Sequence, residues 1–255
     1  PMGKDHTGRT VKRVFTRKGF LKKAGRVGVL STYGVKTLLY GIILPGPEIA
    51  KRNSRLLHKI IDDGHELGIH GYDHVYWHDY IKALGRDETD GILRRSVEVY
   101  RETVGDNPKS FAAPGWMVNG YALKYIENNG FVYTSNARGR SPFYPMLGGD
   151  KFSILEVPST LPTLDEVVGL EGTDMPSLAE YFFHSLRGGL NIMTVHTELE
   201  GKNWLGFFET FLKKSLEAGF LFKKLIDIAL ENKAKHGPEV SEMRYGSVEG
   251  RAGEV

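Results

Sequence analysis

The stretch "GIHGYDHVYWHD", residues 68–79, concentrates side chains that can do chemistry. His70 and His74 are four positions apart, and a chain that leaves a buried strand in one helical turn would present both imidazoles on one side. Two neutral imidazoles placed in this way suit zinc or another first-row divalent ion, and they need a further ligand, usually a carboxylate. A polar, aromatic loop can show the same spacing by chance, so spacing alone leaves both interpretations open.

Other segments place polar residues just beyond apolar runs. "SFAAPGW" ends at Pro114 and Gly115, where the backbone could approach a ligand or form an ordinary turn. "YTSNARG" ends in Arg138, and "NIMTVHTELEG" places His196 and Glu198 after an apolar stretch. A histidine in that position is either functional or a satisfied core residue. The appearance of such residues after successive strands favours a common site.

The elements that must position these residues alternate along the chain. From Pro45, a proline-led helix stops at Gly64, and a strand follows over residues 66–70. Strands alternating with helices of this length predict parallel βαβ units, in an open sheet or a barrel. The further predicted strands cover residues 110–113, 131–135, 152–157 and 191–196, and the helices cover residues 87–104, 121–128, 178–187 and 204–217.

Composition limits the chemistry that the site can use. The 255 residues, 40% of them hydrophobic, can bury a full core as one large α/β domain or two small ones. The absence of cysteine excludes disulfides, zinc–cysteine sites and thiol catalysis. Any metal ion must therefore be held by histidine and carboxylate side chains.

The net charge of +3 is unevenly distributed. Residues 9–26 contain eight Lys and Arg residues and no acid, interleaved with apolar side chains. This segment could lie on an anionic bilayer, or it could be a solvated helix; no nucleic-acid motif accompanies it, so we predict no nucleic-acid partner. Residues 27–44 are apolar but contain Lys36 and several glycines, which favours a buried or interfacial helix and loop over a signal anchor.

Six motifs, in this order, resemble those of a known family: "PGPEIA", "GIHGYDH", "AAPGW", "YTSNARG", "VPSTLPTLDEVVG" and "VHTELEG". Together they resemble the polysaccharide deacetylases of the NodB-homology type. Within that family they most resemble the deformylases of 4-formamido-arabinose carried on undecaprenyl phosphate. The resemblance covers most of residues 45–217 and implies a distorted (β/α) barrel. One departure is Ala112, where the wider family has an arginine.

The resemblance implies metal-dependent hydrolysis of an N-formyl or N-acetyl group on an amino sugar, most specifically a lipid-linked formamido-arabinose. His70 and His74 would hold a divalent ion (Zn, Co, Mn or Ni), and His196 would be the general acid. Arg138 would orient the base or bind a substrate phosphate. The expected substrate-binding residues are Pro114, Gly115, Trp116 and Glu198.

One expected part of the family site is absent. The family begins with a strand that carries an Asp pair, the general base and the third metal ligand, and no segment before Ile69 resembles it. We therefore expect a barrel that lacks its first strand and a nearly inactive fragment, with a non-catalytic carbohydrate-binding relative as the alternative. Asp5 and Asp73 are the acids to test first if the chain is active.

The same resemblance predicts three regions and a location. Residues 1–44 form a basic, partly apolar membrane-interface segment, residues 45–236 the deacetylase-like catalytic domain, and residues 237–255 a flexible C-terminal tail. A lipid-linked substrate and an anionic membrane surface are the expected partners, and the oligomeric state stays open. The expected location is peripheral, at the cytoplasmic face of a bacterial inner membrane, in lipid A modification.

Overall fold

A short parallel sheet lies at the centre of the fold. The computed structural model describes residues 1–17, 19–235 and 237–255. The sheet has the order β1 (Ser110–Phe111), β2 (Tyr133–Thr134), β5 (Leu155–Glu156), with all pairs parallel. A single bridge from Ile69 to Phe111 continues it on the β1 side. This order brings the carboxyl ends of segments that are far apart in the sequence to one edge.

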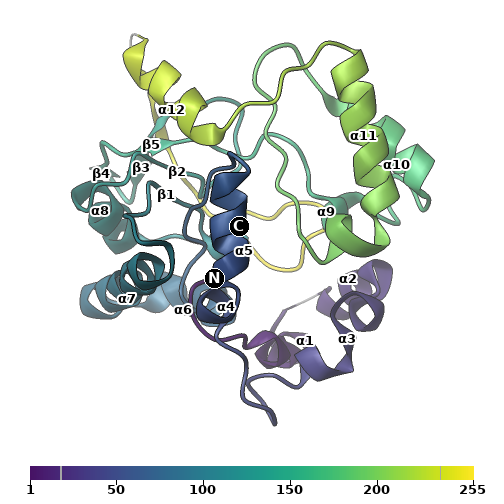
Figure 1. Cartoon of the computed structure of the whole chain (residues 1–255), viewed down its shortest axis with the longest axis horizontal. Helices are drawn as coiled ribbons and strands as arrows, with labels where there is room; N and C mark the ends of the chain where they lie inside the picture. Colours follow the sequence, from purple (N-terminus) through teal and green to yellow (C-terminus); the bar gives the residue numbers. More distant parts are fainter. Residues whose placement is uncertain (18, 236) are drawn as a thin grey trace.

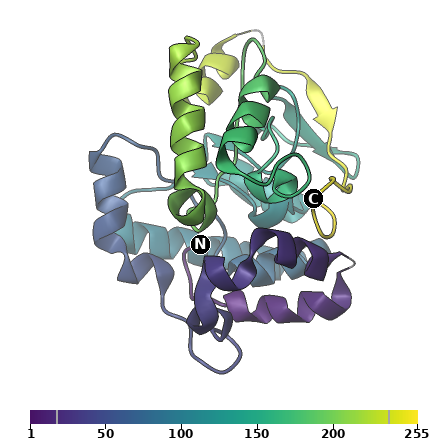
Figure 2. The same ribbon diagram turned by 90° about the vertical axis from the view of Figure 1, so that its right-hand side faces the viewer.

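Helices pack around this sheet (Figures 1 and 2). The pair α7 (Arg86–Val104) and α8 (Gly120–Asn128) packs together on one side, and the pair α10 (Met175–Ser185) and α11 (Leu205–Glu217) packs together on the other. The further helices are α1 (Arg13–Thr16), α2 (Phe20–Val27), α3 (Val29–Leu38), α4 (Ile49–Arg52), α5 (Ser54–Asp62), α6 (His74–Tyr80), α9 (Leu164–Val167) and α12 (Leu225–Ala234), with short turns η1 (Thr7–Lys12), η2 (Ile81–Ala83), η3 (Pro114–Trp116) and η4 (Leu199–Asn203).

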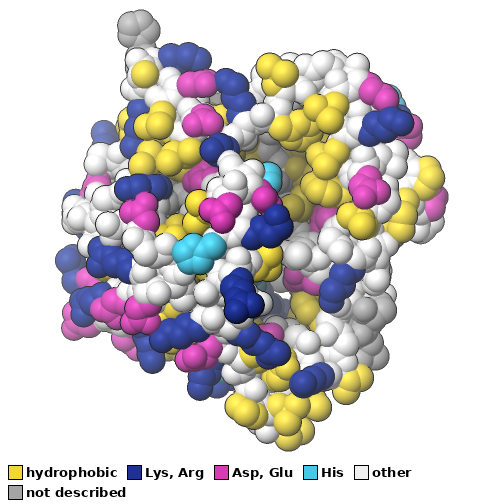
Figure 3. Space-filling view, in the orientation of Figure 1, with side chains coloured by type: hydrophobic (Ala, Val, Ile, Leu, Met, Phe, Trp, Pro, Cys, Tyr) yellow, Lys and Arg dark blue, Asp and Glu magenta, His cyan; other side chains and the backbone are white. Residues whose placement is uncertain are grey.

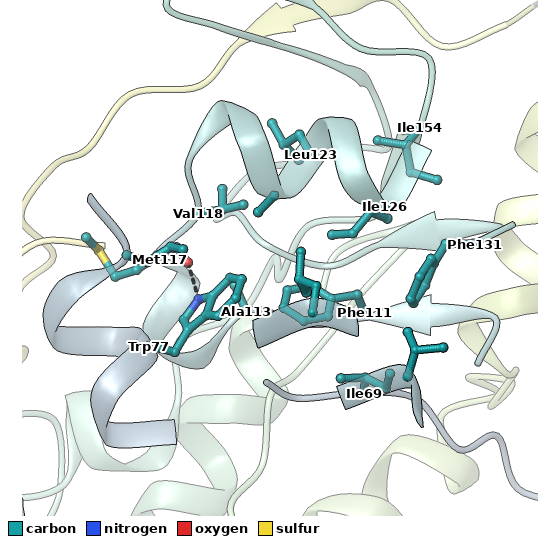
Figure 4. Packing of buried hydrophobic residues seen from close by; sticks show 14 of the residues in the cluster. Ile69, Trp77, Phe111, Ala113, Met117, Val118, Leu123, Ile126, Phe131 and Ile154 are labelled. Atoms are coloured by element: carbon teal, nitrogen blue, oxygen red, sulfur yellow. Dashed lines mark hydrogen bonds between the residues drawn. The ribbon is translucent and has the colours of Figure 1, made fainter. Parts of the chain in front are cut away.

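The core next to β1 fixes the orientation of α6 (Figure 4). Trp77 of α6 is fully buried, and its ring packs against Phe111 with the ring centroids 5.2 Å apart. Its indole Nε1 donates a hydrogen bond of 2.7 Å to the carbonyl of Met117. Burying an aromatic side chain of this size contributes on the order of 3 kcal/mol. Because Trp77 lies one turn after His74, the same packing holds the helix that presents His74.

The α/β class is confirmed, and helices α7, α8, α10 and α11 begin and end within three residues of the predicted ranges. Two predicted strands are less regular. Over residues 66–70 only Ile69 forms a bridge. The Glu66 carboxylate of this segment accepts hydrogen bonds from the Ser110 and Tyr133 hydroxyls. Residues 191–196 form no ladder; instead the carbonyl of Ile192 accepts hydrogen bonds from the backbone N–H groups of residues 160 and 161.

Residues 1–44 are integrated with the rest of the chain. Met2 belongs to the main core, and the N–H of Gly3 donates to the carbonyl of Tyr72 at 2.8 Å. Helix α3 is interrupted at Gly34, whose φ of 74° is left-handed. Within the described ranges, no helix is both long and apolar enough to cross a membrane. Lys18, part of the basic segment, lies outside the described residues.

The C-terminal residues 237–255, for which the sequence predicts a flexible tail, pack onto the molecule. Strand β6 (Val240–Glu242) pairs with β3 (Tyr144–Leu147), which also pairs with β4 (Asp150–Lys151). The Tyr245 hydroxyl donates to the carbonyl of Val118, and Arg251 forms an ion pair with Glu166. The polar composition of this segment therefore does not reveal its long-range contacts. Residue 236, the predicted boundary, is outside the described residues.

Candidate active site

His70 and His74 lie side by side. Gly68 approaches Ser110 so closely that a Cβ would lie 2.4 Å from its hydroxyl, which brings the end of this segment against β1. Asp73 then caps α6, since its carboxylate accepts a 2.9 Å hydrogen bond from the N–H of Tyr76. With His74 as the first residue of the helix, the two imidazole centroids are 5.0 Å apart. The two rings are close together as predicted, but the predicted helical turn between them is wrong: residues 70–73 are not helical, and the chain bends at Gly71, whose φ is 71°, before α6 begins at His74.

The protonation of this pair suits metal binding. His70 Nδ1 lies 2.8 Å from the carbonyl oxygen of Ala112; a carbonyl only accepts, so Nδ1 carries the proton and Nε2 keeps its lone pair. Burial lowers the pKa of His70 to about 3 and also lowers the pKa of His74. Both imidazoles are thus neutral at physiological pH, as ligands must be.

The described residues supply this pair without completing a coordination sphere. Across residues 1–17, 19–235 and 237–255, no group of three or more His, Cys, Asp or Glu side chains is arranged to hold an ion. Asp5 lines the same cavity as the pair, and its Oδ1 accepts hydrogen bonds from the N–H and hydroxyl of Thr7. Asp73 is engaged as the helix cap and by His6 at 2.5 Å. The residues therefore fit a divalent ion through two histidine ligands.

A cavity of about 580 Å³ joins the two histidines to His196 and Glu198. His196 Nδ1 is buried, has no hydrogen-bond partner, and lies 3.9 Å from Oδ1 of Asp165. The Glu198 carboxylate accepts a 3.0 Å hydrogen bond from the Tyr33 hydroxyl. The predicted metal ligands and the predicted general acid thus face one space.

Asp165 is a site residue that the sequence reasoning missed. It lies in α9, whose first turn is closed by reciprocal hydrogen bonds between Thr163 and Glu166. Burial raises the pKa of Asp165, but the neighbouring charges of Lys23 and His196 outweigh that effect and hold it well below its usual range. The carboxylate is therefore ionised beside His196. The only signal for it was the acid in "LPTLDEV".

Four of the predicted site residues are not among those that line the cavity. The Arg138 guanidinium binds both oxygens of Glu166, at 2.8 and 3.1 Å, and lies over the Trp116 ring. Trp116 is 8% exposed and donates to the Ser159 hydroxyl. Pro114 and Gly115 pack near Gly71 and His78, respectively, in η3. The roles expected for these four stay predictions.

Comparisons with known proteins agree with this fold. The polysaccharide deacetylase family model matches residues 26–134. The chain is 31% identical over 230 residues to a probable 4-deoxy-4-formamido-L-arabinose-phosphoundecaprenol deformylase of Wigglesworthia glossinidia brevipalpis, covering 89% of this chain and 79% of the relative. It is 32% identical over 228 residues to a protein of the same name from Shewanella sediminis, covering 89% and 73%.

A solved structure of a candidate polysaccharide deacetylase from Mycobacterium smegmatis superposes with a TM-score of 0.63 at 22% identity, covering 96% of this chain and 92% of that one. The architecture is therefore that of the deacetylase-type barrels, as the sequence predicts. By its match to full-length relatives, the chain belongs to the polysaccharide deacetylase family, in the branch of the two deformylases. It is a hydrolase of amide carbon–nitrogen bonds.

Proposed function

We propose that the protein removes the N-formyl group from a formamido-arabinose carried on a phosphate-linked lipid, and that it needs a divalent ion to do so. The observation that carries this proposal is the single cavity shared by the His70–His74 pair and His196. The deformylase names of the two relatives support the choice of substrate.

The chain's own residues have separate tasks in this reaction. His70 and His74 would hold the ion, whose chemistry there would be Lewis-acid polarisation of the formyl carbonyl and a lowered pKa of a bound water molecule. His196 turns its Nδ1 side to Asp165, which leaves Nε2 to protonate the departing sugar amine. The ionised Asp165 stabilises the charged imidazole at the moment it carries that proton. Glu198, held by Tyr33, contacts the sugar hydroxyls.

Formate release from the lipid-phosphate-linked sugar, measured after metal removal and after reloading with single metals, tests the proposal. We expect activity to return with at least one divalent ion. His70→Ala and His74→Ala should lose both bound metal and formate release, whereas His58→Ala, an exposed histidine of α5, should keep both. Formate release that continues in both site variants would refute the proposal, and release of acetate from the N-acetyl sugar at the same rate would refute the formyl assignment.

We also propose that the protein works peripherally at the cytoplasmic face of a bacterial inner membrane, in lipid A modification. Large apolar side chains are exposed along residues 11–44, with Phe15 87% and Ile43 73% exposed. Figure 3 shows hydrophobic side chains gathered at the lower end of the molecule, over the loop between α3 and α4. Basic residues of the same segment can add about 1 kcal/mol each on an anionic surface.

Co-sedimentation with vesicles tests this location. Binding should be stronger to anionic than to neutral vesicles and should decrease with added salt. Phe15→Ser should weaken binding, while Leu221→Ser, which removes an equally exposed apolar side chain far along the sequence, should not. Equal binding to anionic and neutral vesicles would contradict the proposal.

A further inference from the structure

The lining of the cavity carries an excess of positive charge. Among the described residues, six Lys or Arg side chains and three carboxylates line the cavity. The cations are Lys4, Arg13, Arg17, Lys23, Lys202 and Arg251, and the carboxylates are those of Asp5, Asp165 and Glu198. Inside a cavity, where water screens poorly, such an excess favours an anionic ligand.

Arg13 is the strongest indication of what that ligand is. This residue of α1 is only 8% exposed, and its Nε donates a 2.9 Å hydrogen bond to Oδ1 of Asp79. Its second terminal nitrogen, Nη2, is buried and has no hydrogen-bond partner, and Oδ2 of Asp79 is buried without one as well. Buried polar groups without partners are unfavourable, so this group of charges is incompletely paired as it stands.

Arg17 adds a second positive charge beside Asp79. Its guanidinium donates to Oδ1 of Asp79 and to Nε2 of His78, both at 2.9 Å. One carboxylate therefore serves one buried and one half-buried guanidinium group, and its Oδ2 also lies 3.4 Å from the Lys12 ammonium. The sum of these charges remains positive. A second anion would balance the positive charge without displacing Asp79.

The position of these cations relates them to the candidate active site. The ring of His78, which accepts from Arg17, makes an edge contact with the His74 ring at a centroid distance of 6.3 Å. On the far side, the Lys23 ammonium pairs with Asp165, the neighbour of His196. The cationic residues therefore contact, through His78, the predicted metal ligand His74 and, through Asp165, the neighbour of the predicted general acid, and all of them line one cavity.

We propose that Arg13 and Arg17, with Lys23 beside them, form a subsite for the phosphodiester group that joins the sugar to its lipid. The placement of the sugar rests on the proposed function, whereas the binding of a phosphodiester does not. Guanidinium groups suit phosphate oxygens because their N–H groups form a planar fork. A phosphodiester presents two free anionic oxygens, which the guanidinium groups of Arg13 and Arg17 can share.

Calorimetry with dibutyl phosphate tests the subsite without any turnover. Loss of one charged hydrogen bond should weaken binding about 10-fold or more in Arg13→Gln. Arg13→Lys can keep the ion pair with Asp79 but lacks the second nitrogen, so it should weaken binding similarly even if the Gln variant folds poorly. Lys22→Gln removes the same charge from an exposed position of α2 and should bind as the wild type does.

Equal affinity of the wild type and Arg13→Lys for dibutyl phosphate would overturn the subsite, and so would binding of inorganic phosphate with none of the diester. Turnover separates the two proposals. The wild type should show a lower KM for the butyl-phosphate-linked formamido sugar than for the free sugar, and the two values should converge in Arg13→Lys. Diester binding without formate release would refute the proposed function alone, while formate release with equal KM values would refute the subsite alone.

Discussion

Glu156 couples the stability of the sheet to pH. This residue of β5 is fully buried, and its carboxyl group accepts hydrogen bonds from the Thr134 hydroxyl at 2.7 Å and from the N–H groups of Asn136 and Ala137 at 2.6 and 2.9 Å. Asn136 in turn accepts from the N–H of Ala113, so the network ties the ends of β1, β2 and β5 together. Burial outweighs these bonds and raises the pKa of Glu156 to about 7.

The direction of the pH effect follows from that pKa. Below the ordinary value of 4.5, the carboxyl is protonated in both the folded and the unfolded chain. As the pH rises from 4.5 to about 7, the unfolded chain releases the proton and the folded chain keeps it, so the free energy of unfolding decreases through this window. Above about pH 7 the decrease in the free energy of unfolding is complete. It amounts to about 3 kcal/mol, because the pKa of Glu156 is about 7 in the folded chain and 4.5 in the unfolded chain.

Glu156→Gln should remove this loss. The amide imitates the protonated carboxyl: its carbonyl oxygen accepts from the two backbone N–H groups, and its NH₂ donates to the Thr134 hydroxyl. We expect the variant and the wild type to be similarly stable at pH 4.5, and the variant to be more stable by about 3 kcal/mol at pH 8.

Urea unfolding followed by tryptophan fluorescence, at steps from pH 4.5 to 8, measures the difference directly. Taking the difference between variant and wild type cancels the titration of all other groups. Glu98→Gln, at an exposed position of α7, removes the same charge and should give a profile parallel to that of the wild type. A difference between Glu156→Gln and wild type that does not change with pH would refute the reasoning.

Three further substitutions test single parts of the site. His196→Ala should lower turnover by roughly 10²- to 10⁴-fold while metal content, measured by elemental analysis, stays normal. Arg138→Gln removes one of the two guanidinium partners of the buried Glu166, which keeps Arg251, and should lower the free energy of unfolding by about 2 kcal/mol, measured by urea unfolding, with no change in KM. Asp73→Ala removes the cap of α6 and should cost about 1 kcal/mol of stability and weaken metal binding, because His74 begins that helix. Unchanged metal affinity in this last variant would contradict the positioning role.

The spacing of the histidines could be interpreted from the sequence because it is a local property. His70 and His74 are only four positions apart, so a bend at Gly71 and the start of α6 at His74 are enough to bring their rings together. The helices α7 and α11 were predictable for the same reason, since their apolar periodicity is contained in the segment itself.

Contacts between distant segments could not be predicted in this way. Arg13 looked like one charge in a solvated or membrane-facing run, but Asp79, 66 positions later, draws it into the cavity wall. Arg138 was expected to face substrate, and its actual partner Glu166 lies in a different element. A charged residue by itself predicts an exposed position. Burial becomes favourable only when a partner of opposite charge is present, and the local sequence does not show which distant residue that partner is.

Asp165 gives the sharpest test of how the candidate site works. Its ionised carboxylate lies between the Lys23 ammonium and the His196 imidazole, and it also accepts a hydrogen bond from the Thr163 hydroxyl. Asp165→Asn keeps the shape of the side chain and removes the charge. The protonated imidazole then loses the carboxylate that stabilises it, so kcat should decrease by roughly 10-fold or more, the alkaline limb of the pH–rate profile should move to lower pH, and KM should change little. Metal content should stay normal because His70 and His74 are untouched. A purely structural role would instead lower stability and leave the pH–rate profile in place, and that result would remove Asp165 from the mechanism.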